Sequence, residues 1–174
     1  MATQGTQKLL EEHYLLPVTS IRVTIHTLGI FFESDTRSEN HTSIYLLTGD
    51  KQSVQLNMIK AGPTDVMGTL LRKRCGYDLS NTALKRIDLQ AIQGLTVGQV
   101  LQLLDQKGRA NYKLAPSGMG CRFWVRTMIE DLEAAGYINP SSPIKVNEAI
   151  EDLQYNYSKN QAREYDPMEP GTFV

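Results

Sequence analysis

The sequence predicts an α+β fold, in which an antiparallel β-sheet of four to six strands packs against two or three helices. Residues 18–59 alternate between apolar and polar side chains, as half-buried strands do. Apolar residues recur at helical spacing after Thr96 and again after Cys121. The 174 residues, 41% of them hydrophobic, are enough for one domain with a sizeable core.

We expect one folded unit between two polar ends. Residues 1–16 form a polar leader with a short helical piece from Gln7 to Tyr14, which Pro17 ends. Residues 17–157 form a single α+β domain. Residues 158–174 form a polar C-terminal tail that drapes over the surface or is disordered.

Most of the expected strands lie in the first half of the chain. From Val18 to Phe32, alternate positions are apolar, which predicts a half-buried strand. Thr42–Thr48 and Ser53–Ile59 flank a turn at 49–52, which predicts a hairpin. The other segments are less regular: residues 33–40 are expected to form a loop, 64–80 show no clear pattern, 83–92 alternate like a further strand, and 109–114 are short and extended.

Two or three helices are expected in the second half. Thr96 is a capping residue, and the apolar residues after it repeat at helical spacing until Lys107 and Gly108 end the helix. A second helix begins at Cys121 and runs to about Ala135, where Gly136 stops it. The third is a short helix within residues 146–155.

Composition excludes several classes of function. The net charge of −1 argues against binding to nucleic acid or to an anionic membrane. No apolar run reaches the ~20 residues of a membrane span, and residues 1–12 lack a signal-peptide core, so we expect a cytoplasmic protein. Two cysteines and three histidines without zinc spacing predict no metal, and the absence of nucleotide-binding glycine motifs predicts no cofactor. A homodimer is compatible with the apolar content.

Cys121 is the first candidate for chemistry. The glycine-flanked turn Gly118–Gly120 delivers it to the first turn of a helix, where unpaired N–H groups favour the thiolate. Gly120 also lets a substrate approach the backbone closely. The alternative is that Cys121 is a small core residue on the same helix face as Val125.

His41 is the candidate base, because an imidazole titrates near neutral pH. Gln55 and Asn57 lie two residues apart on one strand face, so either can orient the imidazole ring. His26, in the preceding strand, is a second candidate base. The alternatives are a surface position for His41 and a solvent-exposed face for the two amides.

Five further residues are candidates for contact with a substrate or for reactivity, and each has a structural alternative. Tyr45 and Tyr112 can line the cleft or simply fill half-buried strands. Arg122 can hold an anionic group or belong to an exposed helix face. Trp124 can stack on a substrate, although packing is its commoner role. Cys75, beside a basic run, is a minor candidate for a reactive thiol.

Residues 40–136 resemble the circularly permuted papain-like proteins, the NlpC/P60-related group that includes lecithin:retinol acyltransferase-like proteins and PPPDE-type peptidases. Residues 41–45 read His-Thr-Ser-Ile-Tyr, similar to the histidine motif of that group, and a second strand with polar residues follows. Tyr112 then precedes Cys121 by a compatible distance, and Phe-Trp-Val at 123–125 follows it. The Gly-x-Gly-Cys-Arg-x-Trp run also resembles that of small fungal proteins.

The resemblance implies a permuted papain-like order, with Cys121 as nucleophile, His41 as base and Gln55 or Asn57 orienting the imidazole. Three features depart from the pattern. Thr42 stands where the group has an aromatic residue, Gly120 stands where it has asparagine, and the hairpin carries no second histidine.

The sequence thus predicts a small cysteine-dependent hydrolase or acyltransferase acting on an acyl, amide or peptide substrate. Two alternatives remain open. The same pair can serve as the acid and base of an isomerase or cyclase that acts on a small metabolite without a covalent step. The chain can also be an inactive member of the same fold that binds a small ligand or a protein, including a structural subunit that docks through its C-terminal segment.

Overall fold

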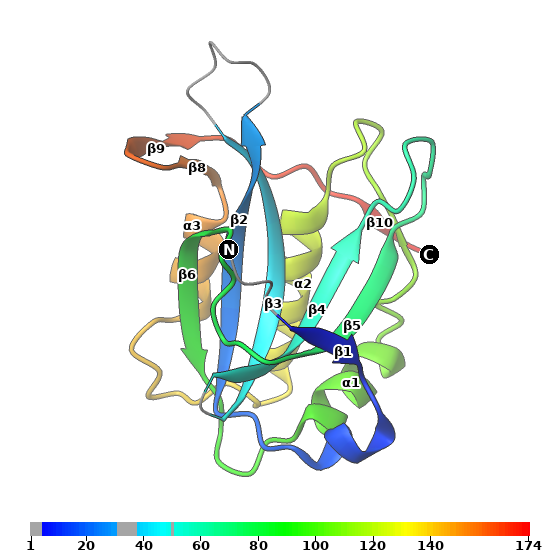
Figure 1. Cartoon of the computed structure of the whole chain (residues 1–174), viewed down its shortest axis with the longest axis vertical. Coiled ribbons are helices and arrows are strands. Elements are labelled where there is room, and N and C mark those ends of the chain that lie inside the picture. Colours follow the sequence, from blue (N-terminus) through cyan, green and yellow to red (C-terminus); the bar gives the residue numbers. More distant parts are fainter. Residues whose placement is uncertain (1–4, 31–37, 50) are drawn as a thin grey trace.

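Six strands form one antiparallel sheet, and helices cover one of its faces (Figure 1). The computed structural model describes residues 5–30, 38–49 and 51–174. This architecture confirms the predicted α+β class. The strands lie across the sheet in the order β1 (Thr6–Lys8), β5 (Thr69–Cys75), β4 (Gln52–Ile59), β3 (Ser38–Gly49), β2 (Ser20–Ile30) and β6 (Ala83–Gln90).

Strand β2, between β3 and β6, is buried on both faces, although its alternation predicted a half-buried strand. Ile21, Val23 and Ile25 face the helices and are fully buried. The polar residues between them are buried too, because the segment 76–82 covers the other face. Arg22 donates to the carbonyl of Asp78, and residue 82 contacts the same strand through a side-chain hydrogen bond.

Strand β5 lies in a stretch where the sequence showed no clear pattern. It pairs with β4 from Thr69 opposite Ile59 to Cys75 opposite Ser53. The basic run Arg72–Arg74 hides the alternation. Arg74 is nevertheless buried, because its guanidinium donates to Thr48 Oγ1 and to the carbonyl of Ser53.

The predicted helical piece from Gln7 to Tyr14 is wrong at its start, and the chain is helical only from Glu11. Thr6–Lys8 form the edge strand β1, which pairs with β5, and a 3₁₀ helix, η1, follows at Glu11–Leu15. The edge of β5 offers unpaired backbone groups, so these residues gain more hydrogen bonds as a strand than as a short isolated helix. The predicted loop at 33–40 lies largely outside the described residues, and its last three residues belong to β3.

The helices begin and end close to the predicted residues. Helix α1 (Val97–Gln106) is capped by Thr96, whose hydroxyl accepts from the Gln99 N–H. Helix α2 (Cys121–Ala134) follows Gly120 and ends before Gly136, and α3 spans Val146–Asp152. The apolar stripe of α2 packs into the main core against β3 and β4. No helix in the described part of the chain is both long and apolar enough to cross a membrane.

Strands β3 and β4 separate toward the end where α2 begins (Figure 1). Their paired residues run from Gly49 opposite Gln52 to Ile44 opposite Leu56. Beyond that pair, β3 continues with its earlier residues along β2 alone, as His26 opposite His41 shows. The opening between the two strands sets the position of the candidate site.

The C-terminal residues form three further strands, and the expected start of a tail at residue 158 is the last residue of the first of these. Strands β8 (Tyr155–Ser158) and β9 (Gln161–Tyr165) form a hairpin. The chain then crosses the molecule to β10 (Thr172–Phe173), which pairs with β7 (Tyr112–Lys113). The segment 166–174 therefore packs on the domain through specific contacts.

Candidate active site

A cleft of about 470 Å³ lies where β3 and β4 separate. The start of β3, the end of β4 and the turn before α2 supply most of its walls. The cleft thus joins three segments that are far apart in the sequence. The residues on which the site depends are His41, Asn57, Lys60, Leu114, Gly120 and Cys121.

Two glycines shape the turn that leads into α2. Gly118 and Gly120 have φ angles of +81° and +134°, which side chains rarely adopt. Within the turn, the Ala115 N–H donates to the carbonyl of Met119. A Cβ on Gly120 would lie 2.8 Å from the hydroxyl of Tyr112, so a side chain there would also collide with a buried ring.

Cys121 is the first residue of α2 and is half-buried. The first hydrogen bond of the helix runs from the Trp124 N–H to the Gly120 carbonyl, so the N–H groups of residues 121–123 precede the helical ladder. Their positive partial charge favours an anion at this position, either the thiolate or a developing oxyanion.

His41 bridges Asn57 and Cys121. Its Nε2 lies 2.5 Å from Asn57 Oδ1. Because an amide oxygen only accepts, Nε2 carries the hydrogen and Nδ1 is left to interact with Cys121. The imidazole and the thiol each shift the pKa of the other. Asn57 therefore fixes the tautomer that a base for Cys121 requires.

The pKa values of the two residues shift in opposite directions. Burial alone lowers the pKa of His41, but the hydrogen bond and charge of Cys121 outweigh it, and the net pKa is raised. Burial alone raises the pKa of Cys121, but the hydrogen bond and charge of His41, the Thr42 N–H and the charge of Arg122 outweigh it, and the net pKa is lowered. Both shifts favour a thiolate–imidazolium pair.

Gln55 does not orient His41. Its amide donates to Ser43 Oγ at 3.1 Å, because Gln55 lies where β3 and β4 are still paired, opposite Tyr45. Asn57 lies past the last pair of that ladder and reaches across the opening. Of the two amides that the sequence left as alternatives, Asn57 is the one in contact with the imidazole.

His26 is a structural residue. Both of its ring nitrogens have partners, Thr82 Oγ1 at 2.8 Å and Ser43 Oγ at 2.9 Å. Burial, followed by the charge of His41, lowers its pKa to about 4. The rings of His26 and His41 stack with centroids 6.3 Å apart. Because both ring nitrogens are engaged and the pKa is low, His26 is poorly suited to take a proton from Cys121.

Three predicted substrate contacts lie in the interior instead. Tyr45 is buried against His26 and Tyr77, in a small apolar cluster on the other face of the sheet. Trp124 is fully buried, and its indole N–H donates to the carbonyl of Arg109. Tyr112 is fully buried beneath the turn before α2, where its hydroxyl donates to the Gly120 carbonyl at 2.7 Å.

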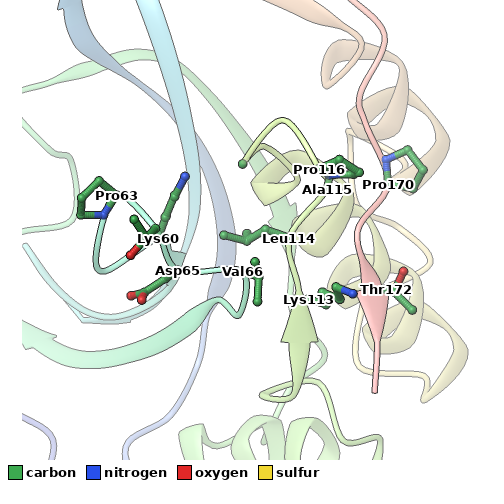
Figure 2. A pocket seen from close by; sticks show the side chains of 12 residues that line it. Lys60, Pro63, Asp65, Val66, Lys113, Leu114, Ala115, Pro116, Pro170 and Thr172 are labelled. Atoms are coloured by element: carbon green, nitrogen blue, oxygen red, sulfur yellow. The ribbon is translucent and has the colours of Figure 1, made fainter.

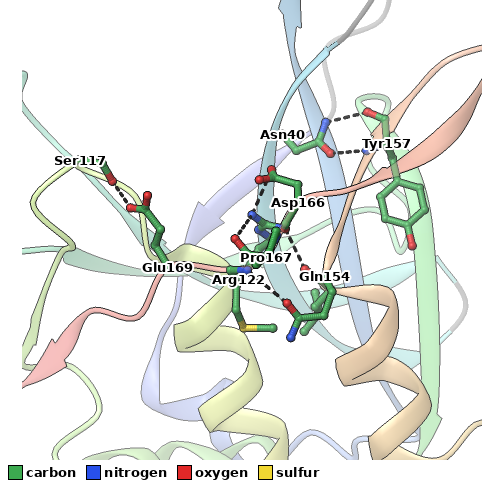
Figure 3. Close-up of polar contacts among 10 residues, drawn as sticks. Asn40, Ser117, Arg122, Gln154, Tyr157, Asp166, Pro167 and Glu169 are labelled. Atoms are coloured by element: carbon green, nitrogen blue, oxygen red, sulfur yellow. Dashed lines mark hydrogen bonds and ion pairs between the residues drawn. The ribbon is translucent and has the colours of Figure 1, made fainter.

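Arg122, the residue after Cys121, holds the C-terminal segment (Figure 3). It donates to the carbonyls of Leu153 and Asp166 and pairs with the Asp166 carboxylate at 3.2 Å. These partners occupy the guanidinium that the sequence offered to an anionic substrate. A small hollow of about 60 Å³ next to Cys121 is walled by this segment, including Pro167 and Glu169.

A second hollow of about 540 Å³ adjoins the cleft (Figure 2). The two share Lys60, Leu114 and Gly118. Neither Lys60 nor Leu114 was singled out from the sequence. The available signal for Lys60 was a charged residue directly after the strand that carries Asn57.

Side chains that could bind a metal ion do not form a cluster in the part of the chain that the structure describes. Across residues 5–30, 38–49 and 51–174, no group of three His, Cys, Asp or Glu side chains is placed to hold a metal ion. The chemistry available at the cleft is that of Cys121, His41 and Asn57.

Comparison with known proteins gives one match. The model of a family described as a domain of unknown function (DUF7770) matches residues 21–174. This range starts in β2 and includes every residue of the candidate site as well as the C-terminal segment. No curated protein matches the chain, and no solved structure does.

Proposed function

The chain belongs to the DUF7770 family, and we propose that it is a cysteine-dependent enzyme that cleaves or transfers an acyl group. The single observation that carries the proposal is the series Asn57–His41–Cys121. Asn57 hydrogen-bonds the imidazole, and the imidazole and the thiol shift each other's pKa, so that the pKa of His41 is raised and that of Cys121 is lowered. A thiolate beside an oriented imidazolium at a helix start is the equipment of a thiol nucleophile.

In the proposed reaction, the thiol proton of Cys121 resides on His41 Nδ1 before the substrate reacts. The thiolate attacks the acyl carbon and forms a C–S bond. The electron pair of the carbonyl moves to its oxygen and then expels the leaving group, which takes the proton from His41. Water gives hydrolysis and a second nucleophile gives transfer. In either case the attacking group returns its proton to His41, and the C–S bond breaks.

The start of α2 supplies stabilisation for the oxyanion. The N–H groups of residues 121–123 point along the helix axis toward the cleft end, and they are not used by the helix itself. The lack of a side chain at Gly120 leaves the approach to these groups open.

The order of the residues along the chain supports a permuted papain-like assignment. The histidine comes first on β3, the amide next on β4, and the cysteine last at the start of α2. Thr42, one of the departures from that pattern, contributes through its backbone, because its N–H helps to lower the pKa of Cys121. A backbone contact of this kind does not depend on an aromatic side chain at position 42.

The first prediction concerns the reactivity of Cys121 toward iodoacetamide. In a Cys75→Ser background, Cys121 should be alkylated rapidly at pH 6, where an ordinary thiol of pKa about 8.5 is about 0.3% ionised. His41→Ala should slow labelling at pH 6 at least about tenfold, and Asn57→Ala should slow it less. The measurement is the rate of labelling by mass spectrometry from pH 4 to 10.

Two results would count against this function. If Cys121 reacts only after denaturation, it is a core residue and the nucleophile is lost. If Cys121 is reactive but p-nitrophenyl acetate leaves no acetyl group on it, the pair serves acid–base chemistry without a covalent step. Cys121→Ser, with its less acidic hydroxyl, is the matched control for the acetyl adduct.

A further inference from the structure

We infer that the substrate carries a carboxylate, and that Lys60 binds this group where the cleft meets the second hollow. The inference rests on the proposed function, because it describes what is bound beside Cys121. It assigns to Lys60 the role of selecting the substrate by its charge.

Lys60 lies directly after β4 and lines both hollows. A Cβ on Gly118 would lie 2.8 Å from Lys60 Nζ, so the ammonium group rests against the turn three residues before Cys121. Gly118 is without a side chain at this point and leaves room for the ammonium. Within the described ranges, no carboxylate forms an ion pair with Lys60. Its charge is therefore available to a ligand.

The charges of the second hollow favour one negative group. Lys60 and Lys113 line it against a single carboxylate, that of Asp65. Figure 2 shows the Lys60 side chain extending away from Asp65. One positive charge thus remains unbalanced, which fits a carboxylate better than a doubly charged phosphate.

The cleft itself has opposite charges at its two sides. Glu39, at the start of β3, is the carboxylate that lines it, whereas Lys60 comes from the end of β4. A substrate whose reacting carbonyl lies at Cys121 would therefore bind with its anionic end toward Lys60 and away from Glu39.

The walls between Cys121 and Lys60 are largely apolar. Met58 and Leu114 are buried side chains that line the cleft, and Leu28 and Met119 are exposed by 61% and 43% at its margin. The portion of substrate next to the scissile bond is therefore apolar, with the carboxylate beyond it. Hollows of about 470 and 540 Å³ accommodate a short peptide or an acylated amino acid.

The test compares two electrophiles of the same shape, 3-maleimidopropanoate and its neutral amide. Both are reacted with Cys121 in the Cys75→Ser background at pH 6.5 and low salt. The measured quantity is the ratio of the anionic to the neutral labelling rate. Lys60→Met should lower this ratio about fivefold, the factor expected for losing one unit charge about 4 Å away in water. Added salt should shrink the difference between the two proteins.

Lys107→Met is the matched control, because it removes the same charge from the exposed end of α1, away from the cleft, and should leave the ratio unchanged. An equal ratio in wild type and Lys60→Met would overturn the inference while leaving the nucleophile intact. Failure of both reagents to label Cys121 would instead remove the proposed function, and this inference with it.

Discussion

His26 and His41 occupy opposed positions on adjacent strands, yet their pKa values move in opposite directions. His26 hydrogen-bonds only to hydroxyl groups, and these do not offset the free-energy cost of burying a positive charge. His41 faces a thiol that becomes negative when the imidazole becomes positive. The partners of each ring, rather than its burial alone, set the direction of its pKa shift.

The lowered pKa of His26 predicts a loss of stability in mild acid. Its pKa is about 4 in the folded protein and about 6.5 unfolded, so the unfolded chain binds more protons between these values and stability falls as the pH falls. We expect His26 to account for a loss of about 2 kcal/mol in the free energy of unfolding between pH 7 and pH 5. Urea unfolding of wild type and His26→Gln at both pH values measures it. An equal acid sensitivity in the two proteins would contradict the assignment.

The sequence singled out the candidate residues by their chemistry but did not show their contacts. Cys121 and His41 stand out because few side chains can act as nucleophile and base. Gln55 and Asn57 share a strand face, and only the point where β3 leaves β4 decides between them. The inward placement of Tyr45 depends on the covering segment 76–82, which has no regular pattern to reveal it.

At the scale of elements, the start of α2 is the critical junction. The helix places its first residue in the opening between β3 and β4, and Gly120 allows it to do so. Gly136 ends the same helix with a φ of +76°, but no neighbouring atom lies within 4 Å of the position that a Cβ would take there. The two glycines therefore differ in what surrounds them.

We predict that Gly120→Ala and Gly136→Ala will separate stability from reactivity. Each should lose about 1–2 kcal/mol because alanine disfavours a positive φ. Only Gly120→Ala should also slow the alkylation of Cys121 at pH 6, because its methyl group would press on the Tyr112 hydroxyl and displace the helix start. Unfolding curves and labelling rates of both variants test this. Equal labelling rates would show that the turn does not set the position of the nucleophile.

Elements were predictable where local signals agreed with tertiary contacts. Thr96 and Gly136 marked helix ends that the structure retains. Strand β5 was missed because Arg72–Arg74 occupy a strand whose partners, including the Ser53 carbonyl, are distant in sequence. Strand β1 was mistaken for helix because its pairing with β5 outweighs a weak local preference.

At the scale of the molecule, the C-terminal segment supports the site through contacts with Tyr112, which lies beneath the turn before α2. The Gly171 N–H donates to the Tyr112 hydroxyl, which in turn donates to the Gly120 carbonyl. Phe173 packs on the Tyr112 ring with centroids 4.8 Å apart. The anchoring of this segment was not predictable from composition, because these contacts are made by single residues within a polar stretch.

Removing residues 166–174 should therefore weaken both the fold and the site. The deletion leaves the buried Tyr112 hydroxyl short of a partner and frees Arg122, so we expect the free energy of unfolding to fall by about 3 kcal/mol. Labelling of Cys121 at pH 6 should slow. Gly171→Val is a milder version, since its Cβ would lie 2.4 Å from the Lys113 carbonyl.

Deletion of residues 1–8 is the control for this truncation. It removes β1, whose side chains are all exposed, and should cost less stability while leaving the labelling rate unchanged. Undiminished labelling after loss of residues 166–174 would show that the segment covers the domain without positioning Cys121.

The hydrogen bonds from Gly171 to Tyr112 and from Tyr112 to Gly120 also set an order during synthesis on the ribosome, because Gly171 is made after Cys121. Translation adds residues at about 5–20 per second, so the brace is made about 3–10 s after the cysteine it supports. A nascent chain during that interval carries the thiol without its finished surroundings. The proposed Cys121–His41 pair therefore gains this support only after residue 171 has been synthesised.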